Sequence, residues 1–186
     1  TGWVQFYVET AQEALDTVLQ AYRVAEQVLL PALVNLDAFY VSHALEPVRL
    51  PSQGTVDAYL PPFEPLHRLD TAQVESWGNV VSQDMFYRHR QALQQSMDRV
   101  PQLLAEADGA WADRFGRSWG VVERYRCDGA ATVVVTMGSM CGSARDAIDA
   151  MKTDSGHFAG LFSRYNRLTG KVEDLEEHDM PVADFT

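Results

Sequence analysis

The feature that most constrains the fold is a short apolar run that follows an amphipathic helical pattern near the start of the sequence. Residues 28–36, VLLPALVNL, are almost all apolar. A strand that is apolar on both faces is typical of the centre of a parallel sheet covered by helices. Pro31 cannot donate a ladder hydrogen bond, so we expect the strand to begin at or after it. The run therefore predicts an α/β architecture.

Residues 10–27 predict the helix that precedes this strand. Thr10 and Glu13 have the spacing of a capping box. Apolar residues form one stripe at helical spacing, which we expect to face the sheet, at positions 11, 14, 15, 18, 19, 22 and 25. A helix followed by a strand is half of an α/β unit. We therefore expect the sheet that receives the strand to be supplied by a segment before residue 1 or by another chain.

Polar side chains follow the predicted strand. Asp37, Ser42 and His43 lie within seven residues of one another. They either take part in catalysis at the edge of the sheet or are hydrogen-bonded polar groups where the strand ends. Adjacent residues of a strand point in different directions, so we do not expect Ser42 and His43 to form a catalytic pair. His43 is then either a neighbour of an active site or a structural group.

A proline-rich segment separates two regular regions. Residues 45–84 show little periodicity, which indicates an extended connector on the surface, and we place the domain boundary at residues 48–85. Pro101 is expected to kink or divide the helix that follows, and Gly116 is expected to end it. One face of this helix is apolar, with Leu93, Met97, Val100, Leu104 and Ala107.

A second α/β pattern begins after this helix. Residues 119–127 predict a strand, Asp128–Gly129 a turn, and residues 131–137, ATVVVTM, a buried strand. A glycine loop and a helical segment at 144–151 follow. This order of strand, loop and helix is typical of a doubly wound sheet. We expect one further short helix around residues 158–167.

The loop GSMCGS has two interpretations. Backbone N–H groups at a helix N-terminus attract anions, so Gly138, Ser139, Gly142 and Ser143 are candidates for an anion-binding loop. The alternative is a tight turn in which Ser143 caps the helix. The loop matches neither a P-loop nor a G-x-G-x-x-G fingerprint. Cys141 within it is either a thiolate or a buried, inert thiol.

Composition argues against several classes of protein. A formal net charge of −11 argues against nucleic-acid binding, which needs a basic patch. Cys127 and Cys141 are too few for an iron–sulfur cluster, which takes about four thiolates, and the histidines lack metal-ligand spacing. No apolar run approaches the roughly 18–20 residues that cross a membrane. The N-terminus shows no signal peptide, so we expect a cytoplasmic protein without a metal site.

Several stretches taken in series resemble the alpha subunit of the pyruvate (2-oxoacid):ferredoxin oxidoreductases. The most specific is the strand that ends in D-x-F-x-x-S-H at Asp37, Phe39, Ser42 and His43. The resemblance covers roughly residues 2–150, in the family's order, and is carried by GWVQFYVETAQEALDTVLQAYRVAE, LPALVNLDAFYVSHALEPVRLP, VDAYLPPFEP and GRSWGVVERYRCDGAATVVVTMGSMCGSARDAI.

This resemblance implies a fold and a division of the chain. Residues 1–47 would be the C-terminal part of a pyrimidine-type thiamine-diphosphate-binding domain, and residues 48–85 a connector. Residues 86–186 would be a small doubly wound, transketolase C-terminal-like domain with a divergent tail. The chain would lack the family's N-terminal half, including the glutamate that activates thiamine. No catalytic residue of the family is then carried onto this chain, and the strand-end polar groups would support an active site that another chain completes.

The resemblance also implies an activity. The family oxidatively decarboxylates a 2-oxo acid to acyl-coenzyme A and passes the electrons to ferredoxin. Thiamine diphosphate, Mg²⁺ and iron–sulfur clusters would be held in the complex, none of them by this chain alone. Expected partners are a chain carrying the N-terminal half of the alpha subunit, beta and iron–sulfur subunits, ferredoxin and coenzyme A. Pyruvate is the expected substrate. The alternative is a non-catalytic assembly module derived from the same fold.

Overall fold

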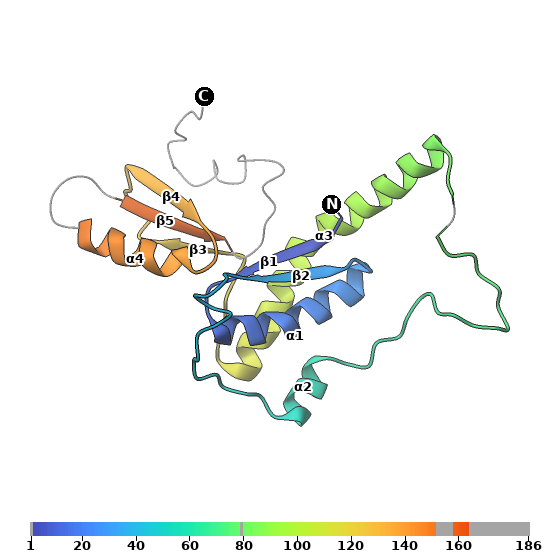
Figure 1. Cartoon of the computed structure of the whole chain (residues 1–186), viewed down its shortest axis with the longest axis horizontal. Helices are drawn as coiled ribbons and strands as arrows, with labels where there is room; N and C mark the ends of the chain where they lie inside the picture. Colours follow the sequence, from blue (N-terminus) through green and yellow to red (C-terminus); the bar gives the residue numbers. More distant parts are fainter. Residues whose placement is uncertain (1, 79, 152–157, 164–186) are drawn as a thin grey trace.

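The computed structural model describes residues 2–78, 80–151 and 158–163. Two mixed α/β units lie side by side, joined by the chain that follows the long helix α3 (Figure 1). In chain order the elements are β1 (Val4–Val8), α1 (Ala11–Val28), β2 (Ala32–Leu36), α2 (Gln53–Tyr59), α3 (Gln83–Phe115), β3 (Val122–Tyr125), β4 (Thr132–Thr136), α4 (Met140–Ala150) and β5 (Phe158–Ser163).

The first unit is a β–α–β unit. Strand β1 pairs in parallel with β2, with Val4 opposite Ala32, and α1 connects the two strands. The expectation that the whole receiving sheet comes from elsewhere is wrong, because residues 4–8 supply the strand that β2 pairs with. The alternation in VQFYV, which buries Val4, Phe6 and Val8, is the pattern that indicates this strand.

Helix α1 begins at the predicted cap. The Thr10 side chain accepts a hydrogen bond from the Glu13 N–H at 3.2 Å. The Glu13 carboxylate accepts from the Glu9 N–H at 2.7 Å, one residue before the position that a capping box predicts. The helix ends at Leu29, which adopts a left-handed conformation with φ 53°.

The buried face of α1 differs from the predicted apolar stripe. The stripe is only partly buried, and Val18 and Tyr22 are 41% and 58% exposed. The buried positions are instead Glu13, Asp16, Thr17, Gln20, Ala21, Val24 and Val28. The apolar periodicity predicts the wrong buried face. The polar residues on the face that is buried have hydrogen-bond partners far away along the chain.

Part of the connector is helical. It contains the short helix α2, capped by Ser52. Tyr59 at the end of this helix is fully buried, and its hydroxyl donates to the Ala107 carbonyl at 3.0 Å. The Tyr59 ring also meets the Trp111 ring edge-on, with centroids 5.0 Å apart. The expectation of a wholly extended connector is therefore wrong, because one aromatic side chain anchors its first part to α3.

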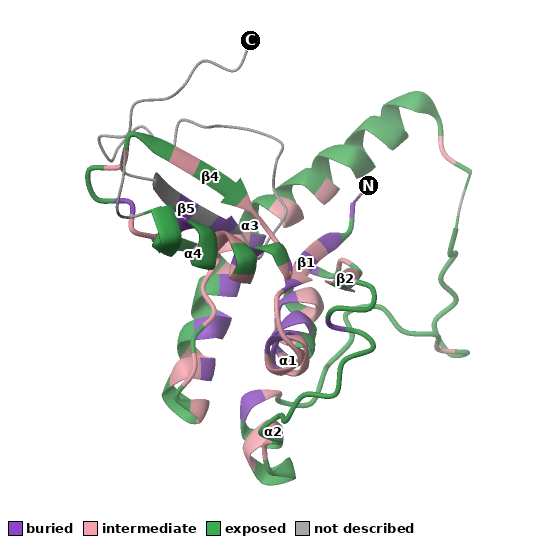
Figure 2. Ribbon diagram, turned by 60° about the vertical axis from the view of Figure 1, so that its left-hand side comes forward, coloured by how far each residue is buried: buried purple, intermediate pink, exposed green. Residues whose placement is uncertain are grey.

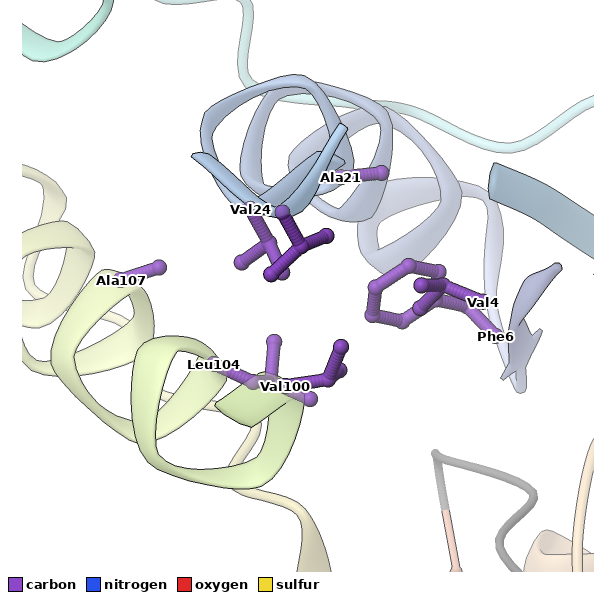
Figure 3. Close-up of a cluster of buried hydrophobic side chains, with 8 residues drawn as sticks. Val4, Phe6, Ala21, Val24, Val100, Leu104 and Ala107 are labelled. Carbon is purple, nitrogen blue, oxygen red and sulfur yellow. The ribbon is translucent and has the colours of Figure 1, made fainter. Parts of the chain in front are cut away.

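Helix α3 runs unbroken through Pro101, so of the two predicted effects of the proline, a kink or a division, division does not occur. Gly116 ends it with φ 67°, as expected. Val100, Leu104 and Ala107 pack against strand β1 and helix α1 in one hydrophobic core (Figure 3). This packing places α3 in the first unit, whereas the predicted division gives it to the second.

The second unit is a three-stranded sheet in the order β3-β5-β4. Strand β5 is parallel to β4 and antiparallel to β3. Residues 158–163 thus form a strand where the sequence predicts a helix, and the rest of that predicted helix lies outside the described residues. Strand β4 is mostly exposed instead of buried (Figure 2), with Val135 58% exposed, because α4 covers only one side of the sheet. Across the described part of the chain, no helix combines the length and apolar character needed to cross a membrane.

Candidate functional site

The candidate site lies where the carboxyl edge of the first sheet meets the second unit. Glu9 directly follows β1, and Asp37 directly follows β2. The carboxyl ends of parallel strands meet at one edge, which is where α/β proteins place their ligands. In this protein Ser139, the N-cap of α4, binds Asp37, and Arg145 in the middle of α4 binds Glu9.

Asp37 binds the residue at the N-terminus of α4. Its Oδ2 accepts two hydrogen bonds of 2.6 Å, from the Ser139 N–H and the Ser139 hydroxyl. These hydrogen bonds hold the pKa of the Asp37 carboxyl below its ordinary value of 3.8. Gly138 has φ 72°, and a Cβ added there would lie 2.7 Å from Asp37 Oδ2. The close approach of the carboxylate therefore requires glycine at this position.

Arg145 of α4 bridges two carboxylates. Its Nη1 and Nη2 both bind Glu9, with 3.0 Å between Nη2 and Oε2. Nη2 also donates to Glu123 of β3 at 2.6 Å. The two carboxylates raise the pKa of the Arg145 guanidinium, with the hydrogen bond to Glu9 as the largest cause. The guanidinium further stacks over the Phe162 ring at 4.6 Å.

A small cavity of about 80 Å³ lies at this junction, lined by Tyr7, Glu9, Glu13, Trp119, Glu123, Gly138, Cys141, Arg145 and Phe162. That volume has room for a few water molecules. It is well below the roughly 300–1,000 Å³ of pockets that enclose a drug-sized ligand. Three carboxylates and one arginine give the lining a net negative charge. As it stands, the junction holds two units together and leaves little space for an organic ligand.

Cys141 lies in this junction as a buried free thiol. Burial raises the pKa of the thiol, and a hydrogen-bonding contact with Thr136 at 3.2 Å only partly opposes that effect. This environment favours the inert thiol over the thiolate. Cys127, the other cysteine, is also free and buried.

The predicted anion loop divides into two parts in the structure. The donors of Ser139 are directed at Asp37, so the anion they bind is a carboxylate of the same protein. Gly142 and Ser143 lie inside α4, which begins at Met140. Ser143 is therefore not the helix cap that one interpretation predicts.

Ser42 and His43 lie in a turn instead of a strand, and their side chains are hydrogen-bonded to each other. The Ser42 hydroxyl and His43 Nδ1 are 2.7 Å apart, in a turn that follows β2. The turn holds Phe39 at φ 68°, with its N–H donating to the Ser42 hydroxyl at 3.2 Å. The His43 ring lies 4.7 Å from the Phe39 ring, and both side chains are exposed.

Sequence reasoning missed a buried polar network at the base of the junction. The fully buried Asp16 carboxylate accepts from Arg117 at 2.8 and 3.0 Å and from the indole N–H groups of Trp111 and Trp119. The hydrogen bond to the Asp16 carboxylate in turn raises the pKa of the Arg117 guanidinium. The spacing of Glu13, Asp16 and Gln20 on one helical face is the available signal for such a network.

A second buried carboxylate fixes the chain that leads to β3. Asp108 of α3 accepts from the Ser118 hydroxyl at 2.5 Å and from the backbone N–H groups of Trp119 and Gly120 at 3.0 and 2.9 Å. Together with Asp16, it holds residues 117–120 against α1 and α3. The second unit is therefore attached to the first both through this linker and through the junction. Within residues 2–78, 80–151 and 158–163, no three or more His, Cys, Asp or Glu side chains gather in a group that could hold a metal ion.

The comparisons with known proteins place this chain in a family. The family model described as pyruvate flavodoxin/ferredoxin oxidoreductase, thiamine diphosphate-binding, matches residues 1–108. The chain therefore belongs to the pyruvate flavodoxin/ferredoxin oxidoreductase family, in the part that is named for binding thiamine diphosphate.

Curated relatives of the chain include subunits of pyruvate synthase and of a phenylglyoxylate dehydrogenase. It is 42% identical over 163 residues to pyruvate synthase subunit PorA of Methanothermobacter thermautotrophicus, covering 87% of this chain and 42% of the relative. With PorA of Pyrococcus furiosus it shares 39% over 180 residues, 95% of this chain and 45% of the relative. With the alpha subunit of the NADH-dependent phenylglyoxylate dehydrogenase of Aromatoleum evansii it shares 34% over 202 residues, 97% of this chain and 48% of the relative. The chain thus spans less than half the length of each.

The residues at this junction do not by themselves fit thiamine diphosphate. A diphosphate needs N–H donors or cations, and the Ser139 N–H at the start of α4 is bound to Asp37. The nearby cation, Arg145, is neutralised by Glu9 and Glu123. The cavity between these groups is about 80 Å³. A cofactor site at this junction would therefore need residues beyond those that form it here.

Proposed function

We propose that this chain is part of the alpha subunit of a thiamine-diphosphate-dependent 2-oxoacid:ferredoxin oxidoreductase. The enzyme would decarboxylate pyruvate oxidatively, form acyl-coenzyme A and pass electrons to ferredoxin. The single observation that carries the proposal is the identity of about 40% with pyruvate synthase subunits over 87–95% of the chain. The proposal includes a cytoplasmic location.

In this proposal the chain contributes structure more than chemistry. Asp37 and Glu9 attach a transketolase C-terminal-like unit to the carboxyl edge of a pyrimidine-type thiamine-binding domain. Other polypeptide supplies the N-terminal half of the alpha subunit, and beta and iron–sulfur subunits supply Mg²⁺ and cluster binding. Coenzyme A and ferredoxin are the acyl and electron acceptors.

Ser42 and His43 are proposed as supporting residues at the edge of the active site. Their hydrogen bond fixes the exposed turn that directly follows Asp37. Replacing the imidazole in the assembled enzyme, His43→Ala, should lower kcat several-fold while the yield of complex is unchanged. A loss of assembly with a normal kcat in the remaining complex would show that His43 is structural instead.

The test of the enzyme is the composition and activity of the native complex that contains this chain. We expect thiamine and iron in stoichiometric amounts, with pyruvate reducing a viologen dye only when coenzyme A is present. The rival function is a non-catalytic assembly module. A complex with neither thiamine nor iron would establish this rival.

The substrate is tested on the same preparation. Pyruvate is proposed because the PorA relatives are pyruvate synthase subunits. The phenylglyoxylate dehydrogenase relative makes an aromatic 2-oxo acid the informative competitor. One methylene in a pocket is worth about 1–3 kcal/mol of discrimination. A kcat/KM at least about tenfold higher for phenylglyoxylate, 2-oxoglutarate or 2-oxoisovalerate would overturn the choice of pyruvate.

A further inference from the structure

The first part of helix α3 extends beyond the packed part of the first unit (Figure 1). All residues from 82 to 92 are exposed, whereas Val100 and Leu104 farther along the same helix are fully buried. A helix in a protein gains most of its stability from the packing of one face. Residues 83–92, which we call the arm, bury no side chain against the described part of the chain, so the arm lacks such a neighbour.

One face of the arm carries apolar and basic side chains. Phe86 and Arg90 are four residues apart and are therefore neighbours on the helix surface, with Met85 and His89 beside them. Met85 and Phe86 are 49% and 56% exposed. Arg90 forms no ion pair with any of the residues that the structure describes. Methionine, aromatic residues and arginine are enriched where proteins contact each other, so this face has the composition of an interface.

A groove with the opposite charge lies between α1 and the segment that follows α2. Its volume is about 370 Å³, and its lining includes Arg23, Glu26, Pro61, Pro62, Phe63 and Glu64. Sites of roughly 300–1,000 Å³ can enclose a ligand or large side chains. The connector gives the groove an apolar wall of two prolines and a phenylalanine. Glu26 and Glu64 add two carboxylates, neither of which forms an ion pair within the described ranges.

The one cation in this lining is directed at the protein itself. Arg23 Nη1 donates to the Tyr59 carbonyl at 2.6 Å, and the guanidinium lies 4.7 Å from the centre of the Tyr59 ring. Arg23 therefore holds the end of α2 against α1, and the carboxylates of Glu26 and Glu64 are left for another cation. An apolar wall beside two carboxylates fits an apolar and basic group such as the face of the arm.

The arm and the groove of one chain do not meet. Figures 1 and 2 show that the first part of α3 and the helix α2 leave the first unit in different directions, and the groove wall at residues 61–64 directly follows α2. Helix α3 is unbroken from residue 83 to residue 115, so the arm does not turn back toward its own groove. Two copies of the chain can instead exchange arms about a two-fold axis, which closes the assembly.

We propose that the arm of each chain binds the groove of a second copy of this chain. Arg90 neutralises Glu26 and Glu64 of the second copy, and Phe86 packs on the apolar wall. The chain carries a formal net charge of −11, so most of its surface repels another copy. Pairing must then use a place where a basic group meets acidic ones, which the arm and the groove provide. The pairing does not depend on the reaction that the enzyme catalyses.

The native complex that contains this chain provides the test. Two versions of the chain with different affinity tags are produced in one cell, and the fraction of complexes that carry both tags is measured. Arg90→Glu in both versions places like charges together in both contacts, so this fraction should fall about tenfold or more. Glu26→Arg together with Glu64→Arg in both versions should lower it in the same way.

Placing the two changes on different partners should restore the pairing. When one version carries Arg90→Glu and the other carries Glu26→Arg and Glu64→Arg, every arm meets a groove of opposite charge. Both tags should then be recovered together to the same extent as in the unchanged protein. A failure of this combination to restore mixed complexes would overturn the choice of a second copy as the occupant of the groove.

Two further variants test the face of the arm. Arg88→Glu makes the same charge change two residues away, on a different side of the helix, and should leave the pairing unchanged. Phe86→Ala removes the apolar contact from a part of α3 that buries no side chain, so the fold is retained and the pairing should weaken several-fold. Equal pairing of Arg88→Glu and Arg90→Glu, or a native complex with a single copy of this chain, would contradict the proposal.

Discussion

Asp37 and Ser139 lie 102 positions apart and are joined by two hydrogen bonds of 2.6 Å, both to one carboxylate oxygen. The first residue ends a strand of one sheet, and the second begins the helix that covers the other sheet. The two units of this protein are therefore tied together at the edge where α/β folds place their ligands. Four consequences of this and of the buried contacts behind it can be measured.

The charge of Asp37 should contribute measurably to the attachment of the second unit. Asp37→Asn keeps the shape and an acceptor oxygen but loses the charge that strengthens both hydrogen bonds. For a partly exposed group we expect a loss of about 1 kcal/mol in the free energy of unfolding, measured by urea denaturation. Asp57→Asn, which changes an exposed carboxylate bound to Gln53 on α2, is the control and should change stability by less than about 0.5 kcal/mol.

The same contact should weaken in acid. The pKa of Asp37 is lowered by folding, so the unfolded chain binds the proton more readily than the folded chain. Its stabilisation is then complete above the unfolded pKa, near 3.8, and is lost as the pH falls through the lower folded value. The stability difference between the unchanged protein and Asp37→Asn should shrink below about pH 4. A difference that is constant from pH 6 to pH 3 would contradict this assignment.

Loss of Arg117 should be the most damaging of the single charge changes considered. Arg117→Met leaves the fully buried Asp16 carboxylate with its indole donors but no cation. Breaking a buried ion pair lowers the free energy of unfolding by about 3–5 kcal/mol. Because Arg117 is partly exposed, we expect a loss near the lower of these values. Arg88→Met on the exposed part of α3 is the control. The loss of unfolding free energy for Arg117→Lys should fall between those for Arg117→Met and Arg88→Met, because lysine keeps the charge and loses the bidentate geometry.

Tyr59 should anchor the first part of the connector through its ring more than through its hydroxyl. Tyr59→Phe removes one hydrogen bond to Ala107 and should cost about 1 kcal/mol. Tyr59→Ala empties a fully buried site and should cost about 3–5 kcal/mol. Both are read from thermal or urea unfolding, with Tyr87→Ala on the exposed side of α3 as the control. Similar losses for the two Tyr59 variants would mean that the hydroxyl matters more than the ring.

Local sequence patterns predicted correctly those structural elements that depend on neighbouring residues. The Thr10 cap, the Gly116 stop and the strands at 122–125 and 132–136 are dictated by residues within a few positions, so sequence reasoning found them. It missed β1 and mistook β5 for a helix. The alternation of VQFYV is a local signal for β1 that was not used, whereas β5 is a short segment whose strand state depends on partner strands elsewhere in the chain.

The candidate site likewise combines features that local patterns predict with features that depend on distant residues. The sequence by itself singled out Asp37 and the loop at Gly138 and Ser139, because an acid after a strand and a glycine turn before a helix are local patterns. Only the tertiary structure decided that these two features bind each other, and that the polar side of α1 is the buried one. The physical reason is that the free energy of burying Asp16 or Asp37 depends on donors about a hundred residues away, Arg117 and Ser139. Periodicity within one helix or strand carries no information about such partners.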